Sequence, residues 1–448
     1  MMLITNAKII TWESPNRMIE DGAMLIDGDC IRDVGQSQDL VARYPDSEKF
    51  DAKGQFVLPG NICAHTHFYG AFARGMAIPG LPPQDFSQIL SKLWWPLDKS
   101  LTHEDIKYST LVCLIDAIKH GTTTLFDHHA SPNAIDGSLD VIADSVVEAG
   151  VRAVLCYEVT DRSGPEKADA GIKENLRFIR KQEAQPSSWL AATFGLHASL
   201  TLSDQTLTKC REAIPDEFGF HLHAAEADAD QYDSLTKYGM RVVQRLNKMG
   251  ILGPKSILAH GVRIDETEIN ILANTKTWVT HQPRSNMNNG VGVAPIEAML
   301  AADVKLGMGN DGFSNAMWEE WKTAYLLHKA WHRDPRRASG LDILRMAVYN
   351  NAILANQYFP KASIGVISPG ASADVMMVNY HPFTPITAEN IAWHILFGFQ
   401  ESMVTTTIVG GKLLMKDRTL LTIDEERVTA KARELSIKVW ERYEGINS

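Results

Sequence analysis

The sequence predicts an α/β protein: a (β/α)8 TIM barrel with a second, smaller β-sandwich domain formed from both chain ends. Two patterns support this prediction. Short apolar runs alternate with longer helix-like stretches in the middle of the chain, and runs of alternating apolar and polar residues occur at both ends. The length of 448 residues leaves room for a large barrel with an annex, or for two separate domains.

Both ends of the chain have a sequence pattern typical of a small β-sheet. Short runs there alternate apolar and polar positions, and Gly, Asp and Pro separate them. These runs cover residues 7–11, 23–27, 30–34, 373–380, 404–410 and 412–416. We expect residues 1–57 and 363–422 to form one discontinuous β-sandwich domain. Residues 423–448 are expected to form a helix packed on the body, because apolar residues recur there at spacings of three and four.

The middle of the chain, residues 58–362, is predicted to be the barrel. Eight candidate strands can be counted there, and each ends in His, Asp or Glu. They cover residues 57–67, 122–127, 152–158, 191–197, 219–223, 256–260, 277–281 and 304–311. In a parallel barrel the carboxyl ends of all strands open onto one face, which carries the active site. The chemically capable side chains are therefore expected to gather at that face.

The composition excludes several classes of protein. Hydrophobic residues make up 45% of the chain and charged residues 22%, as in an ordinary globular protein. The net charge of −10 disfavours nucleic acid and anionic membranes as partners. No apolar run reaches the roughly 18 residues of a membrane span, and the N-terminus lacks a signal-peptide pattern. The five cysteines are scattered without a CxxC pair, so we expect a reducing, cytoplasmic location.

Two pairs of histidines are spaced to bind one metal ion. His65 and His67 alternate at the end of the first barrel strand, and His221 and His223 alternate on the fifth. Alternate side chains of a strand point the same way, so His65, His67 and His223 can supply three nitrogen ligands. Asp311, between glycines on the last strand, is the natural oxygen ligand. This donor set suits one divalent metal per chain, with zinc expected and iron as the alternative.

Other polar residues fall on the same predicted face. Glu226 lies three residues beyond His223, where it is placed to handle protons rather than to bind metal. His197 and His260 end two further strands. Taken singly, each could instead be a buried structural histidine, but their shared position favours a part in the site.

Further candidates to contact a substrate each have a structural alternative. Trp94 and Trp95 could line a lid or pack in the core. Arg162 could bind an anionic group or remain a surface charge. His128 follows a strand end and is expected to face the pocket. For His281 a structural role is the stronger alternative.

These motifs, taken together, resemble the amidohydrolase superfamily, in particular its mononuclear aminohydrolases that deaminate purines, pterins and triazines. The motifs are HTH after Leu-Pro-Gly, HLHAAE, LAHG, HQPRSN and GMGNDG, in this order over residues 58–314. A closer similarity is to the SsnA branch, whose members often accompany selenium-dependent purine hydroxylases. It is carried by LWWPLD, DHHASP, TDR, RSNMNN and NIAWHILFG. The resemblance implies a hydrolase that releases ammonia from a purine- or pterin-like heterocycle.

The resemblance also implies a role for individual residues. The family's metal ligands match His65, His67, His223 and Asp311. Glu226 matches the proton-shuttling glutamate, His260 the histidine that contacts the water, and His197 a position that contacts substrate. In the implied mechanism Asp311 takes a proton from the attacking water and Glu226 protonates the ring.

Three positions depart from the family pattern. Asp98 stands where thioadenosine-type deaminases carry a ribose-binding Glu, and its shorter side chain argues against nucleoside substrates. Gln282 and Asn310 replace the usual Asn and Thr, and neither is at a ligand position.

Two alternatives stay open at this point. A triazine-type chlorohydrolase could use the same scaffold, although Glu226 favours loss of an amine. A non-catalytic scaffold need not keep four metal ligands, all of which are present here. Cytidine-deaminase chemistry is excluded because its PCxxC zinc signature is absent. The expected partners are a small heterocyclic substrate, water and further copies of the chain in a homo-oligomer.

Overall fold

The apolar runs in the middle of the chain form parallel strands, as predicted. In the computed structural model, which describes residues 1–447, these strands make one sheet of four strands and one of five. The first contains β6 (Asn61–Thr66), β7 (Thr122–His129), β8 (Arg152–Tyr157) and β9 (Leu190–Ala192). The second contains β10 (Phe194–Ala198), β11 (Phe220–Ala224), β12 (Ile257–His260), β13 (Trp278–His281) and β14 (Lys305–Met308).

The two parallel sheets meet at both edges. The fourth predicted strand, residues 191–197, is divided between the two sheets. The N–H of Thr193 donates to a carbonyl of β8, whereas the N–H of Phe194 donates to the carbonyl of Gly219, just before β11. At the opposite edge, a single parallel bridge joins Thr66 to Asp311. The closed eight-stranded barrel itself remains a prediction. All strand pairs in both sheets are parallel, so their carboxyl ends lie on one side, as a shared site requires.

Alternation along the strands explains how the core is built. On β7, Phe126 belongs to a cluster between the sheets, whereas Leu125 belongs to the cluster that packs under the helices. Trp278 and Val279 on β13 divide in the same way. Because successive side chains of a strand point to opposite faces, runs that are apolar throughout fill both layers.

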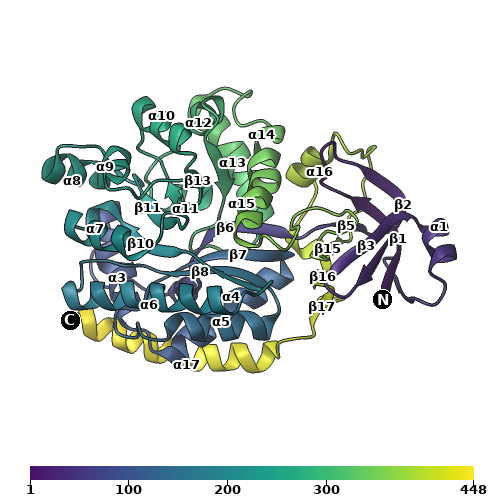
Figure 1. Ribbon diagram of the computed structural model, residues 1–448, viewed down its shortest axis with the longest axis horizontal. Helices are drawn as coiled ribbons and strands as arrows, with labels where there is room; N and C mark the ends of the chain where they lie inside the picture. The colour runs from purple at the N-terminus through teal and green to yellow at the C-terminus, as the bar shows by residue number, and fades with distance from the viewer. Residues whose placement is uncertain (448) are drawn as a thin grey trace.

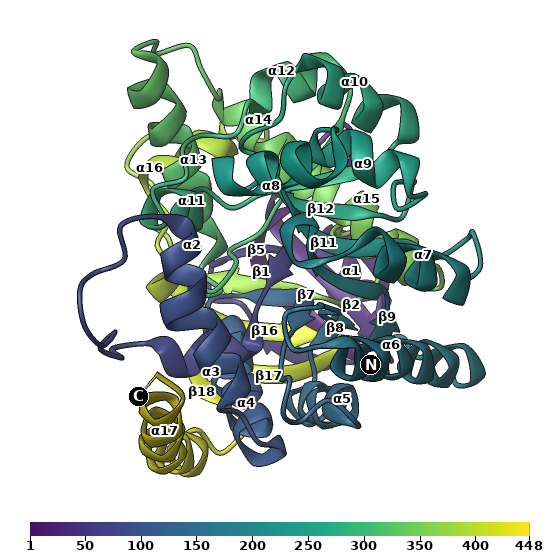
Figure 2. The same ribbon diagram turned by 90° about the vertical axis from the view of Figure 1, so that its left-hand side faces the viewer.

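Helices lie outside the parallel strands (Figures 1 and 2). They are α2 (Phe86–Ile89), α3 (Trp95–Lys99), α4 (His103–Lys119), α5 (Ser138–Ala149), α6 (Pro165–Ala184), α7 (Asp204–Ala213), α8 (Asp228–Tyr238), α9 (Val242–Lys248), α10 (Glu266–Thr275), α11 (Pro283–Asn288), α12 (Ile296–Ala301), α13 (Met317–His332), α14 (Gly340–Leu344) and α15 (Asn351–Tyr358). Helical chain follows every parallel strand except β9, which leads directly into β10, and this is close to the alternation that the sequence pattern predicted.

Strands from both chain ends join in one nine-stranded sheet, at the right of Figure 1. They are β1 (Met2–Ile10), β2 (Met18–Asp27), β3 (Cys30–Gln36), β4 (Glu48–Asp51), β5 (Phe56–Pro59), β15 (Val375–Val378), β16 (Val404–Val409), β17 (Lys412–Lys416) and β18 (Thr419–Leu420). Two helices, α1 (Ser37–Arg43) and α16 (Ile391–Phe397), are inserted between them. The two ends meet where β5 pairs antiparallel with β15. The sandwich is not confirmed, because hydrogen bonds connect all nine strands into a single sheet.

Gly60 marks the passage from the end sheet to the parallel strands. Our expected boundary after residue 57 falls inside β5, which runs to Pro59, and β6 begins at Asn61. A Cβ at residue 60 would lie 2.2 Å from the Thr123 side chain, so only glycine allows this close approach. A buried ion pair between Arg152 on β8 and Asp374 just before β15 also ties the two parts together.

The C-terminal helix α17 (Glu425–Asn447) runs along the lower side of the molecule, where it contacts α3 and α4 (Figure 1). Arg442 fixes it there by donating to the Ser100 carbonyl and the Asp105 carboxylate. A closing helix was predicted here; Ser448, its expected last residue, lies outside the described residues.

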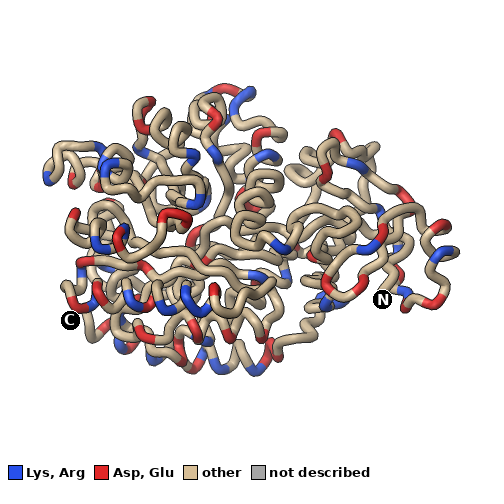
Figure 3. Tube along the Cα trace, viewed as in Figure 1, with Lys and Arg blue, Asp and Glu red and all other residues tan. Residues whose placement is uncertain are grey.

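Acidic and basic residues are interspersed along the outer helices (Figure 3). None of the helices within residues 1–447 combines the length and the apolar character that crossing a bilayer requires.

Candidate active site

Four predicted metal ligands converge at the carboxyl ends of the strands. The Nε2 atom of His67 lies 3.1 Å from Nε2 of His223 and 2.9 Å from Oδ1 of Asp311. Nε2 of His65 lies 3.4 Å from the same Asp311 oxygen. Zinc bonds of roughly 2.0–2.1 Å in a tetrahedral site put neighbouring donors about 3.3 Å apart. The spacing therefore fits a single small divalent ion.

Hydrogen bonds fix which nitrogen each ring presents. Nδ1 of His67 donates to the His128 carbonyl at 2.6 Å, and Nδ1 of His223 donates to the His197 carbonyl at 2.8 Å. A neutral imidazole that donates through Nδ1 carries its lone pair on Nε2. In the neutral form of both rings, the lone pairs would therefore face Asp311 and His65, as metal-binding histidines require.

The remaining predicted ligand, His65, has a buried nitrogen without a hydrogen-bond partner among the described residues. Its Nε2 makes no hydrogen bond within the described chain, although the residue is fully buried. Burial lowers the pKa of His65 to about 3, so the ring is neutral, which is the form that binds metals. An unsatisfied buried acceptor is costly, and a metal ion in the gap would satisfy it. We take this as evidence that these residues fit a metal.

Asp311 is held in place by its backbone and by neighbouring side chains. Burial alone would raise the pKa of its carboxyl, but His65 and His67 hold it well below the ordinary value. Its Oδ2 accepts from the Ser285 hydroxyl at 2.5 Å. Asp311 and His260 have φ angles of 58° and 77°, in the left-handed region that side chains other than glycine rarely adopt. Backbone strain of this kind is typical of functional sites.

Glu226 and His260 face each other beside the four ligands. Oε2 of Glu226 lies 3.4 Å from Nε2 of His260, and Nδ1 of His260 donates to Oδ1 of Asn286 at 2.8 Å. The amide of Asn289 donates to Oε1 of Glu226 at 3.2 Å. Burial raises the pKa of Glu226 to about 7, against the opposing effect of His260. The carboxyl group is thus able to give or take a proton at neutral pH.

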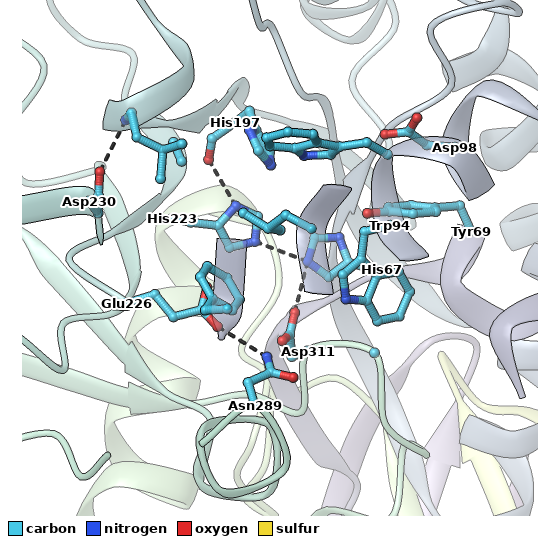
Figure 4. Close-up of a pocket in the computed structure, with 16 residues that line it drawn as sticks. His67, Tyr69, Trp94, Asp98, His197, His223, Glu226, Asp230, Asn289 and Asp311 are labelled. Atoms are coloured by element: carbon cyan, nitrogen blue, oxygen red, sulfur yellow. Dashed lines mark hydrogen bonds and ion pairs between the residues drawn. The ribbon is translucent and has the colours of Figure 1, made fainter. Parts of the chain in front are cut away.

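These groups open into one pocket. Figure 4 shows His67, His223 and Asp311 at its centre, with Glu226 and Asn289 on one side and Asp98 and Tyr69 on the other. The apolar part of the wall comes from Phe86, Leu90, Trp94, Trp95, Ala198 and Leu200. An apolar cleft with a few convergent polar groups is the usual form of a small-molecule site.

Comparisons with known proteins agree with this geometry. The model of the Amidohydrolase family matches residues 56–414, which is most of the chain. The chain belongs to the amidohydrolase family. It is 30% identical to a 5-methylthioadenosine/S-adenosylhomocysteine deaminase from Pelotomaculum thermopropionicum, over 98% of this chain and 99% of that relative. It is 32% identical to a 5'-deoxyadenosine deaminase from Methanobrevibacter smithii, over 92% of each chain.

A solved structure shows the same fold. The chain superposes on an adenosine deaminase from Xanthomonas campestris with bound zinc, with a TM-score of 0.85 and 23% identity, over 98% of both chains. The mixed α/β fold is therefore that of the amidohydrolases.

Asp98 and Arg162 form a buried pair at the edge of this amidohydrolase's pocket. Their side chains are 1% and 8% exposed, and Nη2 of Arg162 donates to Oδ2 of Asp98. The guanidinium lies over the Trp95 ring, 5.5 Å from its centroid. Burial raises the pKa of Asp98 to about 6, against the effect of Arg162. The structure thus brings together three of the predicted substrate contacts, with Asp98 and Trp95 in the lining.

His197 lines the pocket, but His128 does not. Nδ1 of His128 lies 3.0 Å from the Glu158 carboxylate and its Nε2 donates to the His221 carbonyl at 2.8 Å. Both nitrogens are therefore occupied beneath the metal ligands, and the expectation that His128 faces a substrate is corrected. Glu158 also lies 3.7 Å from Nε2 of His197. Burial would raise its pKa, but His197 and His128 hold it well below the ordinary value.

The structure does not bring His281 to the pocket. On β13 it has the same orientation as Val279, so its ring points outward to α13, where its Nε2 lies 3.2 Å from Nε2 of His328. The expectation that His281 contacts substrate is therefore corrected, and the structural alternative fits.

Several polar residues of the site were not singled out from the sequence. Glu158 ends a predicted strand, which was a usable signal. Ser285, Asn286 and Asn289 lie in the RSNMNN motif, but nothing in the motif shows that they reach Asp311, His260 and Glu226. Their roles depend on how α11 is placed against the strand ends.

Proposed function

We propose that this amidohydrolase deaminates an amino-substituted, purine- or pterin-like heterocycle, with one zinc ion held by His65, His67, His223 and Asp311. The two parallel sheets would act as one (β/α)8 barrel that presents these ligands. When bound, the metal supplies a Lewis acid that makes water a nucleophile at neutral pH. Full-length similarity to relatives named as deaminases supports this reaction class.

The residues of the chain divide the proton transfers between them. Nδ1 of His260 is committed to Asn286, so its Nε2 offers a lone pair that can orient the attacking water. Asp311 takes the water's proton and passes it to the departing amine. Glu226 in its protonated form donates to the ring nitrogen next to the carbon under attack. As the amine departs, the second proton of the water returns to Glu226, so that the ring amine and water are converted to a ring carbonyl and ammonia and both carboxyl groups are restored.

The observation that carries the proposal is the environment of Glu226. A glutamate with an ordinary pKa would be ionised at neutral pH and could not donate. Burial brings the pKa of Glu226 to about 7, and Asn289 holds the carboxyl group against the pocket. A proton donor beside a metal site is what loss of an amine from a ring needs.

The substrate class follows from the opposite end of the pocket. Asp98 is short, buried and paired with Arg162, so its Oδ2 is already occupied. Oδ1 of Asp98 and Nε and Nη1 of Arg162 have no partner in the described chain. These three atoms offer one hydrogen-bond acceptor beside two donors. That arrangement matches the donor and acceptor groups along the edge of a heterocyclic base without a sugar. We therefore infer that the free base is preferred over the nucleoside.

The test is ammonia release from matched pairs of aminopurine bases and their nucleosides, with aminopterins and aminotriazines alongside. We expect release from a free base by the zinc-loaded enzyme and none after chelation. The iron-loaded enzyme, prepared without oxygen, decides between the two metals. Faster turnover of nucleosides would overturn the substrate assignment.

Chloride release from chlorotriazines would favour the chlorohydrolase alternative. A chain that binds neither zinc nor iron would favour the scaffold.

A further inference from the structure

A second cluster of metal-binding side chains lies outside the pocket, on α12 and α13. His328 and His332 are four residues apart on α13, so their side chains lie on one face of the helix. Their rings are stacked, with planes 22° apart and centroids 6.2 Å apart. Glu297 on α12 reaches the same place, with Oε2 3.7 Å from Nδ1 of His328. One donor atom from each of the three residues lies within 4.8 Å of the other two.

One side chain of the cluster is buried, and the other two lie nearer the surface. His328 is fully buried, and its Nδ1 has no hydrogen-bond partner among residues 1–447. The Glu297 side chain is 24% exposed and His332 is exposed, so both can adjust and the site is open to ions from solution. The 3.7 Å gap is too long for a hydrogen bond. It is close to the roughly 3.3 Å between two ligands of one zinc ion.

The surroundings leave the donors available. Lys329, on the same helix, donates to the carbonyls of Arg337 and Ala338 and forms no ion pair with Glu297 within the described chain. Among residues 1–447, Glu297 forms its hydrogen bond through Oε1, which accepts from the N–H of Ala338 at 3.2 Å. Its Oε2 therefore remains free for an ion.

His281 can accept the hydrogen bond that a metal-binding histidine usually donates from its second ring nitrogen. Its Nε2 lies 3.2 Å from Nε2 of His328. A metal on Nδ1 of His328 requires the proton of that ring to be on Nε2, from which it is donated to His281. A hydrogen bond from the far nitrogen fixes the tautomer and orientation of a ligand.

We propose that Glu297, His328 and His332 form a second site for a divalent transition metal of the zinc class. Two imidazoles and one carboxylate are a zinc donor set, and three protein ligands leave a position for water. Because two ligands are near the surface and must adjust, this site binds zinc more weakly than the site in the pocket. The pocket's own ligands take no part in it.

The proposal is tested by titrating zinc chloride into the holoenzyme, with binding followed by calorimetry at pH 7.5. We expect one further equivalent in the wild type, and at least tenfold weaker binding in His332→Ala and Glu297→Gln. The exposed His381→Ala serves as the matched control and should bind like the wild type. Because a histidine must be deprotonated to bind, the affinity should fall as the pH is lowered.

A second readout separates the two metal sites and excludes unfolding. His67→Ala should lose the tightly bound ion yet keep the further equivalent. His332→Ala should retain basal turnover and, without added zinc, the unfolding temperature of the wild type. Anomalous scattering from zinc-soaked crystals should place the ion between α12 and α13. Absence of a further equivalent, or unchanged binding in both ligand variants, would overturn the proposal.

Discussion

Glu226→Gln tests the assigned chemistry most directly. The substitution keeps the volume of the side chain and a carbonyl oxygen that can accept from Asn289, but it removes the transferable proton. General acid–base catalysis contributes about 10²–10⁴-fold, so kcat should fall by that factor, which corresponds to roughly 3–5 kcal/mol. Metal content should not change, because Glu226 is not among the four proposed ligands.

The pKa of Glu226 sets the expected pH dependence. With a pKa of about 7, half of the enzyme carries the proton at pH 7. At the ordinary value of about 4.3–4.5, only about 0.2–0.3% would carry it, so burial increases the competent fraction by two orders of magnitude. As the pH rises above 7 the protonated fraction falls tenfold per unit, and kcat/KM should fall with it.

The assay is ammonia release at saturating and limiting substrate from pH 5.5 to 9.5, for wild type and variant, with zinc measured in the same samples. The exposed Glu212→Gln is the matched control and should leave turnover unchanged. A Glu226→Gln enzyme that keeps more than a tenth of wild-type kcat would refute the role of this residue. So would a wild-type profile that stays flat between pH 7 and 9.

Three further predictions concern the metal, the support of His260 and the joint between the sheets. His67→Ala should reduce tightly bound zinc to below a tenth of an equivalent and abolish turnover, as measured by elemental analysis and ammonia release. Asn286→Ala frees Nδ1 of His260 and should lower kcat by about 10–100-fold with the zinc content retained. Asp374→Ala leaves the buried Arg152 unpaired and should lower the free energy of unfolding by about 3–5 kcal/mol, as measured by urea denaturation.

Each of these has its own control. Zinc added back after chelation of the wild type should restore turnover, and failure to do so would remove the metal from the mechanism. Asn286→Asp keeps an acceptor for His260 and should lose less activity than the alanine variant. Asp27 is in an exposed ion pair, so Asp27→Ala should cost less than about 1 kcal/mol. An Asp374→Ala chain as stable as that control would show that the buried pair does not join the two parts.

The parallel strands, and the convergence of the four proposed metal ligands, could be predicted from the sequence for a local physical reason. Apolar runs such as β7 are buried on both faces, which makes them visible without any partner. The HxH spacing puts His65 and His67 on one side of a strand wherever that strand lies. Glu226 follows the fifth strand closely enough that its place at the strand ends is also fixed locally.

Other features depended on tertiary packing. The orientation of His281 and the occupation of both nitrogens of His128 are set by neighbouring strands and by α13, so the sequence predicted substrate contacts that the structure corrects. The tautomers of His67 and His223 depend on carbonyls of other strands. The pKa of Glu226 depends on burial, which a sequence pattern does not show.

The sequence by itself therefore indicated the parallel strands, the family and the proposed metal ligands, because these depend on periodicity and on motifs within single strands. Only the tertiary structure decided which histidines reach the pocket and which are structural. It also revealed that donor atoms of Glu297, His328 and His332 meet, although Glu297 is 31 residues from His328 along the chain. Contacts between distant segments depend on how elements pack, and that information lies outside any local pattern.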